Sequence, residues 1–179
     1  MKREFASGTI ELQQGDITRL EADAIVTAAN SGLRGGGGVD GAVHRAAGPR
    51  LLAACREIGG CSTGSAVATG SYDLANTGIR HVIHAVGPVW RAGNNDEARL
   101  LEGAYATSLG LARQEKCVSI AFPSISTGVY GYPVEQAAPV ALNTCKEFLL
   151  GSPGSVKRII FALFDTKTFE AYERAIEKL

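Results

Sequence analysis

Strand-like and helix-like apolar patterns alternate along this chain almost from end to end. Alternating or uninterrupted short apolar runs indicate strands, whereas apolar residues spaced three or four apart indicate a helix. Alternation of the two predicts an α/β sandwich, in which helices cover a central sheet. The predicted strands are 9–13, 23–28, 66–69, 81–86, 118–122 and 156–164, and the predicted helices are 39–48, 49–58, 96–116, 133–150 and 166–179.

The order of these elements also predicts the kind of sheet and the number of domains. The first two strands follow one another without a helix, so we expect a mixed sheet and not a purely parallel one. The chain has 179 residues, enough for one sizeable core, and residues 151–154 form a turn and not a linker. We therefore predict a single domain over residues 1–179. Ligands of such sheets bind beyond the carboxyl ends of the strands.

Charge and hydropathy narrow the range of partners. Eighteen basic residues balance eighteen acidic ones, so net charge gives no reason to expect nucleic acid, although a local basic patch stays possible. Residues 1–7 contain no apolar run typical of a signal peptide, and no stretch approaches the roughly 20 apolar residues of a membrane span. The four cysteines form no C-x-x-C pair and are interpreted as structural thiols. We expect a cytoplasmic protein without a membrane partner.

Two glycine-rich loops stand at corresponding places in the pattern. Residues 35–38 are four consecutive glycines between a predicted strand and a predicted helix, and residues 124–133 repeat the order of strand, polar glycine-rich loop and helix. Glycine lets backbone amides approach a ligand closely, and amides at a helix N-terminus bind anions. Two such loops are suited to hold a diphosphate with neutral donors. The alternative is a pair of unrelated flexible turns.

Other phosphate-binding and hydrolase motifs fit poorly. Residues 36–41 match G-x-G-x-x-G, but the position near Glu57, where a Rossmann unit needs an acidic residue ending a second strand, is predicted to be helical. Residues 59–65 have the glycine spacing of a P-loop, with Ser65 in place of the lysine. Ser126 lacks the G-x-S-x-G frame of a nucleophile elbow.

Asp40 and His44 are the titratable residues next to the first loop. Asp40 comes at the start of a predicted helix, where a carboxylate either complements the helix dipole or faces a ligand. His44 lies one turn later on the same helical face and is interpreted as a structural partner. His81 and His84 lie in one strand without apparent metal-binding companions. The sequence therefore predicts no metal site.

Taken in order, the motifs resemble those of the macrodomain family over nearly the whole chain. Residues 36–44, Gly-Gly-Gly-Val-Asp-Gly-Ala-Val-His, resemble the MacroD-like hydrolase branch in particular, close to bacterial O-acetyl-ADP-ribose deacetylases. The resemblance implies a three-layer α/β/α sandwich with a central mixed sheet, and no cofactor. It also implies binding of ADP-ribose and of mono-ADP-ribosylated proteins. The other matching segments are 15–18 (GDIT), 28–30 (AAN), 45–48 (RAAG), 86–88 (VGP), 122–123 (FP) and 126–131 (STGVYG).

The resemblance also implies a role for each site residue. At the adenine end, Asp16 and the Ile17 amide would hold the base, and Phe164 would lie against it. At the distal ribose, Asn30 would form a hydrogen bond, Asp40 would position the hydrolytic water, and His44 would support the helix that carries Asp40. The residues that would contact the diphosphate and distal ribose are Gly37, Gly38, Val39, Ser126, Thr127, Gly128, Val129 and Tyr130.

The implied function is removal of mono-ADP-ribose from acidic residues, together with deacetylation of O-acetyl-ADP-ribose. The transition state should resemble an oxocarbenium ion, and a free aspartate with a pKa of about 3.9 is a weak base at neutral pH. Asp40 would therefore mainly orient water. Two residues depart from the family pattern: Thr27 stands where asparagine is common, and Arg34 where an apolar residue is common. A non-catalytic ADP-ribose reader is the main alternative, and neutral charge offers little support for binding adenine-rich RNA.

Overall fold

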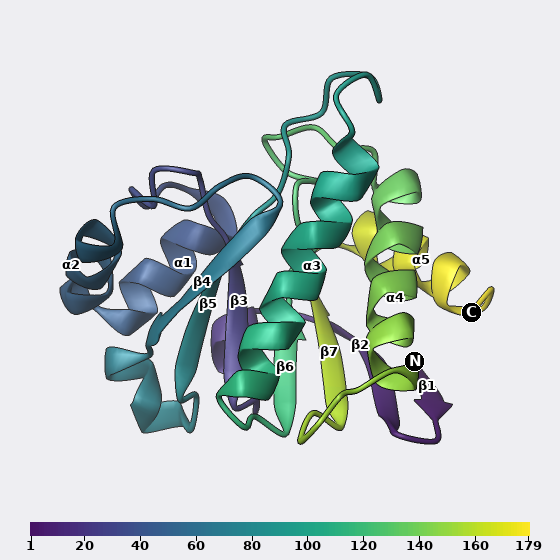
Figure 1. Ribbon diagram of the computed structural model, residues 1–179, viewed down its shortest axis with the longest axis horizontal. Helices are drawn as coiled ribbons and strands as arrows, with labels where there is room; N and C mark the ends of the chain where they lie inside the picture. Colours follow the sequence, from purple (N-terminus) through teal and green to yellow (C-terminus); the bar gives the residue numbers. More distant parts are fainter.

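Seven strands form one sheet in the order β1-β2-β7-β6-β3-β5-β4 in the computed structural model, which describes all 179 residues (Figure 1). The strands are β1 Lys2–Phe5, β2 Gly8–Gln14, β3 Ala24–Ala28, β4 Ser65–Gly70, β5 His81–Val86, β6 Ser119–Phe122 and β7 Arg158–Leu163. The helices are α1 Gly38–Ala47, α2 Pro49–Ile58, α3 Glu97–Gln114, α4 Val134–Leu150 and α5 Thr166–Ile176, with 3₁₀ turns η1 Ile17–Arg19 and η2 Tyr72–Thr77.

The sheet is mixed, as predicted, but its antiparallel neighbours are not the first two predicted strands. Strands β2, β7, β6, β3 and β5 run parallel, while β1 pairs antiparallel with β2 at one edge and β4 with β5 at the other. The first two predicted strands, β2 and β3, are not neighbours, because β7 and β6 lie between them. Strand β1 was not predicted, since its residues Lys2–Phe5 are largely exposed and carry no apolar alternation.

Helices cover both faces of the sheet and complete three layers. Helices α3, α4 and α5 cover one face, and α1 and α2 cover the other (Figure 1). The central strands are apolar on both sides: in β3, Val26 belongs to the larger core cluster and Ile25 to the smaller one. Burial on both faces explains the uninterrupted apolar runs of these strands. No helix is long and apolar enough to cross a bilayer.

The start of α3 differs from the sequence prediction. Asp96 is the first residue of the predicted helix 96–116, but its backbone is left-handed, with φ +60°, and its side chain makes no capping hydrogen bond. Glu97, almost completely buried, takes over instead: its carboxylate accepts hydrogen bonds from the backbone N–H groups of Arg91 and Asn95, at 2.8 and 3.1 Å. These bonds fold the loop before α3 back onto the helix.

Candidate functional site

A cavity of about 380 Å³ lies where the loops after β3 and β6 meet. The two strands are parallel neighbours, so their carboxyl ends lie at the same edge of the sheet, and both glycine-rich loops begin there. The lining comes from residues 28–30, 35–40, 123–126 and 128–130, together with Gly87. The prediction that the two loops converge is therefore confirmed, and the interpretation as unrelated turns is wrong.

Most of the predicted site residues line this cavity, and a few lie outside it. The lining residues named from the sequence are Asn30, Gly37, Gly38, Val39, Asp40, Ser126, Gly128, Val129 and Tyr130. Asp16, Ile17, His44, Thr127 and Phe164 do not line it. Several residues of the family-like motifs also line the cavity although they were not predicted as site residues, and their place in those motifs could have identified them. The lining residues that were not predicted are Ala28, Ala29, Gly35, Gly36, Gly87, Pro123, Ser124 and Ile125.

Asp16 and Phe164 lie together beyond the ends of β2 and β7. The backbone N–H of Gly15 donates to the carbonyl of Leu163 at 3.1 Å, which joins the two turns. Asp16 caps η1, where its Oδ1 accepts from the Thr18 backbone N–H at 2.9 Å. The Phe164 side chain is exposed, and the Ile17 side chain is buried. An exposed aromatic side chain and a carboxylate on two joined turns are suited to bind a flat base with an amino group.

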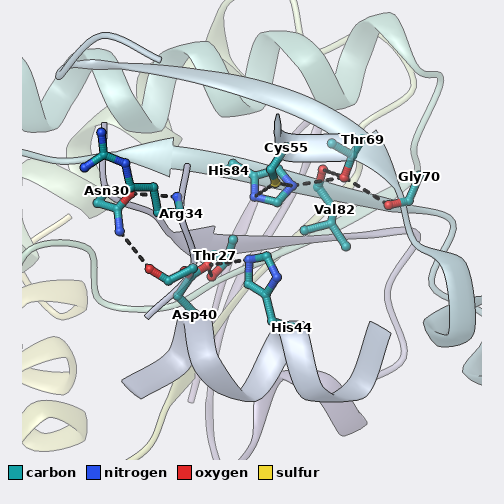
Figure 2. Close-up of polar contacts among 11 residues, drawn as sticks. Thr27, Asn30, Arg34, Asp40, His44, Cys55, Thr69, Gly70, Val82 and His84 are labelled. Carbon is teal, nitrogen blue, oxygen red and sulfur yellow. Dashed lines mark hydrogen bonds and ion pairs between the residues drawn. The ribbon is translucent and has the colours of Figure 1, made fainter. Parts of the chain in front are cut away.

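The Asn30 side chain closes the first glycine-rich loop. Its Nδ2 donates to the carbonyl of Gly35 at 2.8 Å, and its Oδ1 accepts from the backbone N–H of Arg34 at 2.9 Å (Figure 2). The loop then turns into α1 through Gly38, whose φ of +56° strains any other residue. One amide group therefore holds a segment that four glycines would otherwise leave free.

The second loop turns at Ser126, a non-glycine residue in the left-handed region with φ +67°. The Ser126 hydroxyl is the one buried side-chain polar atom without a hydrogen-bond partner, and the residue lines the cavity. A buried hydroxyl without a partner is costly, and a ligand oxygen in the cavity would satisfy it. Thr127 points the other way, because its hydroxyl donates to Ser124 Oγ at 2.8 Å.

Two buried tyrosines support this second loop from beneath. The Tyr105 hydroxyl, from α3, accepts from the backbone N–H of Ile125 at 3.0 Å. The Tyr172 hydroxyl, from α5, donates to Ser124 Oγ at 3.1 Å. Neither supporting role was predicted, because in the sequence both residues look like ordinary core aromatics. Helices on one face of the sheet thus fix a loop at its edge.

Asp40 is the only carboxylate that lines the cavity. Its Oδ1 accepts a hydrogen bond from the Thr27 hydroxyl at 2.9 Å and lies 3.6 Å from Nε2 of His44, as the helical spacing predicted (Figure 2). Burial raises the pKa of Asp40 above its ordinary value, while the Thr27 hydrogen bond and the charge of His44 oppose the rise. The higher pKa makes Asp40 a stronger base than a free aspartate.

The prediction that His84 lacks companions is wrong. His44 from α1, Cys55 from α2 and His84 from β5 bring one potential ligand atom each within 4.8 Å of one another. The Cys55 sulfur lies 3.7 Å from Nδ1 and 3.8 Å from Nε2 of His84, and this near-equality places it over the ring (Figure 2). A metal needs the lone pair in the ring plane, so the arrangement fits a stacked thiol better than a metal centre.

His84 is held neutral in this cluster. Burial lowers the pKa of His84 from its ordinary 6.5 to about 4, and the neighbouring charge of His44 adds to the effect. The Thr69 hydroxyl lies 3.0 Å from Nε2 of His84 and 3.0 Å from the carbonyl of Gly70, so this ring nitrogen has a polar partner inside the core. A neutral His84 therefore adds no positive charge behind the Asp40–His44 pair.

The amino-acid sequence is similar to those of known proteins over most of its length. A sequence profile for the Macro domain matches residues 26–141. An O-acetyl-ADP-ribose deacetylase of Cronobacter turicensis is 49% identical over 174 residues, which are 95% of this chain and 97% of that protein. The ADP-ribose glycohydrolase MACROD2 of Xenopus laevis is 49% identical over 170 residues, which are 94% of this chain but 40% of that longer protein.

A solved structure is similar over nearly the full length. The Oceanobacillus iheyensis macrodomain with ADP matches 99% of this chain and 95% of its own, with a TM-score of 0.92 and 40% sequence identity. The three-layer α/β/α architecture predicted from the sequence is confirmed by this likeness and by the sheet described above.

Proposed function

This chain belongs to the macrodomain family, and from that membership we propose that it is an ADP-ribose-binding hydrolase. Its proposed substrates are proteins that carry mono-ADP-ribose on acidic residues, and O-acetyl-ADP-ribose. The observation that carries the proposal is the position of Asp40: a buried carboxylate with raised pKa lines a cavity between two amide-rich loops. Anion-binding loops alone would serve a reader, whereas a basic carboxylate at the same cavity serves hydrolysis.

We propose that ADP-ribose lies across the edge of the sheet, with the adenine at Asp16 and Phe164 and the diphosphate between the loops. The glycine-rich loop leads into α1, whose N-terminus favours negative charge. The unpartnered Ser126 hydroxyl is available to a phosphate oxygen. The distal ribose would then reach Asp40, with Tyr130 on the opposite loop.

In the proposed reaction, Asp40 orients a water molecule toward the anomeric carbon of the distal ribose. The water oxygen bonds to that carbon as the bond from the carbon to the ester oxygen breaks, and the acidic side chain leaves as a carboxylate with the bonding electrons. The water proton passes to Asp40 or to a phosphate oxygen of the substrate. Negative charge from both groups stabilises the oxocarbenium-like transition state.

The experiment is to incubate the protein with a glutamate-linked mono-ADP-ribosylated protein, and separately with O-acetyl-ADP-ribose, and to measure the products. We expect free ADP-ribose from the first substrate, and ADP-ribose with acetate from the second. Binding of ADP-ribose without release from either substrate would identify a reader and refute the hydrolase. Hydrolysis in labelled water separates attack at the anomeric carbon, which labels ADP-ribose, from attack at the carbonyl, which labels the acid.

Two further points belong to this proposal. We propose that the protein acts in the cytoplasm, since all four cysteines are free thiols, as expected in a reducing compartment. We also propose that residues 1–179 act as one domain, because all seven strands join a single sheet.

A further inference from the structure

The two oxygens of the Asp40 carboxylate are used differently. Oδ1 accepts the Thr27 hydroxyl at 2.9 Å and faces His44. Oδ2 makes no hydrogen bond within the protein, yet it is not fully buried. Because Asp40 lines the cavity, this accessible oxygen faces the cavity. One oxygen thus anchors the side chain, and the other is free to meet a water or ligand.

Thr27 supplies the only short hydrogen bond to this carboxylate. The distance from Oδ1 to His44 Nε2 is 3.6 Å, which is beyond a normal hydrogen bond. An ionised carboxylate only accepts hydrogen bonds, so the Thr27 hydroxyl must donate its single hydrogen to Oδ1. Without that hydroxyl, Oδ1 would keep only the longer contact with His44.

The position of Thr27 makes this donor rigid. The residue lies in β3, is completely buried, and stands opposite His84 in β5 in the parallel register. Branching at the β-carbon restricts the rotamers of Thr27. Because the residue is completely buried, its hydroxyl cannot form a hydrogen bond with solvent in place of Asp40. The hydroxyl is therefore held toward α1 by the core and not by the ligand.

We propose that Thr27 is a positioning residue for Asp40: its hydroxyl holds Oδ1 and thereby turns Oδ2 toward the cavity. The inference rests on the proposed function, in which Oδ2 orients the attacking water. It assigns to Thr27 a role in the hydrolytic step and none in ADP-ribose binding, since Thr27 does not line the cavity.

The same hydrogen bond bears on the ionisation of Asp40. The groups that face the carboxylate are Thr27 from β3, His44 from α1 and Cys55 from α2, with His84 of β5 behind them. Burial raises the pKa of Asp40, and the Thr27 hydrogen bond is the larger of the two opposing effects. Loss of the hydroxyl should therefore raise the pKa of Asp40 further, so that a higher pH is needed to ionise the carboxyl group.

The test compares Thr27→Val, which removes the hydroxyl but keeps the shape, with Thr27→Ser, which keeps the hydroxyl. Titration of the Asp40 carboxyl carbon by NMR in the free protein, assigned with Asp40→Asn, reports the ionisation without any substrate. We expect Thr27→Ser to titrate like the unmodified protein and Thr27→Val to titrate about one pH unit higher, a tenfold change in proton concentration.

Kinetics with O-acetyl-ADP-ribose give the second readout. For Thr27→Val we expect kcat at neutral pH to fall about tenfold and its acid limb to move up with the NMR titration, while ADP-ribose affinity stays within about twofold. If Thr27→Val does not fold, Thr27→Ala serves as the second hydroxyl-free variant. An unchanged Asp40 titration in a folded hydroxyl-free variant would overturn the proposal. If even the unmodified protein fails to hydrolyse, the proposed function fails, and the NMR titration still decides whether Thr27 controls Asp40.

Discussion

The α-carbon of Gly87 lies against the Ser126 hydroxyl, so that a β-carbon on Gly87 would overlap Ser126 Oγ. The contact joins the loop after β5 to the loop after β6 in the wall of the cavity, which both residues line. Position 87 therefore needs a glycine because Ser126 takes up the space of a side chain there. The backbone of Gly87 itself is not in the left-handed region and would accept other residues.

Replacing Gly87 with alanine should therefore displace the second loop and weaken ADP-ribose binding by about tenfold or more, because the added methyl and Ser126 cannot occupy the same space. Calorimetry with ADP-ribose measures the loss. Gly110→Ala is the matched control, since a β-carbon at Gly110 in α3 meets no neighbouring atom. Equal affinity in Gly87→Ala and Gly110→Ala would show that the loop tolerates the contact.

Replacing Asp40 with asparagine should abolish most turnover, retain ADP-ribose binding and stabilise the protein at neutral pH. Burial raises the pKa of Asp40 in the folded protein above its value in the unfolded chain. The ionised carboxylate therefore destabilises the folded state at pH values above the folded-state pKa of Asp40. This destabilisation is absent at pH values below the unfolded-state pKa of Asp40, where the group is protonated in both states. We expect a gain of about 1 kcal/mol at pH 7 that disappears toward pH 3. Thermal unfolding across pH measures it, and full activity in the folded variant would refute the role of Asp40.

Replacing Asp16 with alanine should weaken ADP-ribose binding and reduce discrimination against the inosine analogue. A carboxylate accepts a hydrogen bond from the adenine amino group but repels the carbonyl that hypoxanthine carries there. Calorimetry with both nucleotides measures the effect. If the unmodified protein binds the two nucleotides equally well, Asp16 does not read the base.

Glutamate-linked ADP-ribose should be released at least about a hundredfold faster than serine-linked ADP-ribose, because an alkoxide needs a general acid to leave and a carboxylate does not. The structure supports the premise, since Asp40 is the only carboxylate at the cavity and Glu135 is exposed and paired with Arg174. Two peptides that differ only in the linkage, at equal concentration, provide the test. Comparable rates would mean that His44 or a rearranged Glu135 supplies the proton.

Protonation of His84 should contribute to acid unfolding. Its pKa is lowered from 6.5 to about 4, so between these values the unfolded chain binds a proton that the folded protein does not. Stability should therefore fall as pH drops from 6.5 to 4, by up to roughly 3 kcal/mol from this residue. Urea unfolding at pH 7 and 4.5 should show a smaller loss in His84→Gln than in the unmodified protein. An identical loss in both would assign the acid sensitivity to other groups.

The sequence allowed the strands, the helices and both loops to be predicted because each has a local signal. Helix α2 and strand β5 were predicted to the residue, since proline, glycine and apolar runs mark their ends. Strand β1 has no such signal, because an exposed edge strand needs no apolar face. The meeting of His44, Cys55 and His84 depends on how α1, α2 and β5 pack, and no local pattern encodes it.

The Asn30 bridge across the glycine-rich loop also affects the thermodynamics of association. Its two hydrogen bonds order the segment during folding, before any nucleotide arrives. Binding then resembles docking to a rigid receptor, and the heat-capacity change should follow the apolar area buried, without an added contribution from loop ordering. Removal of the Asn30 amide would return that conformational freedom to the empty protein, and each binding event would have to remove it again.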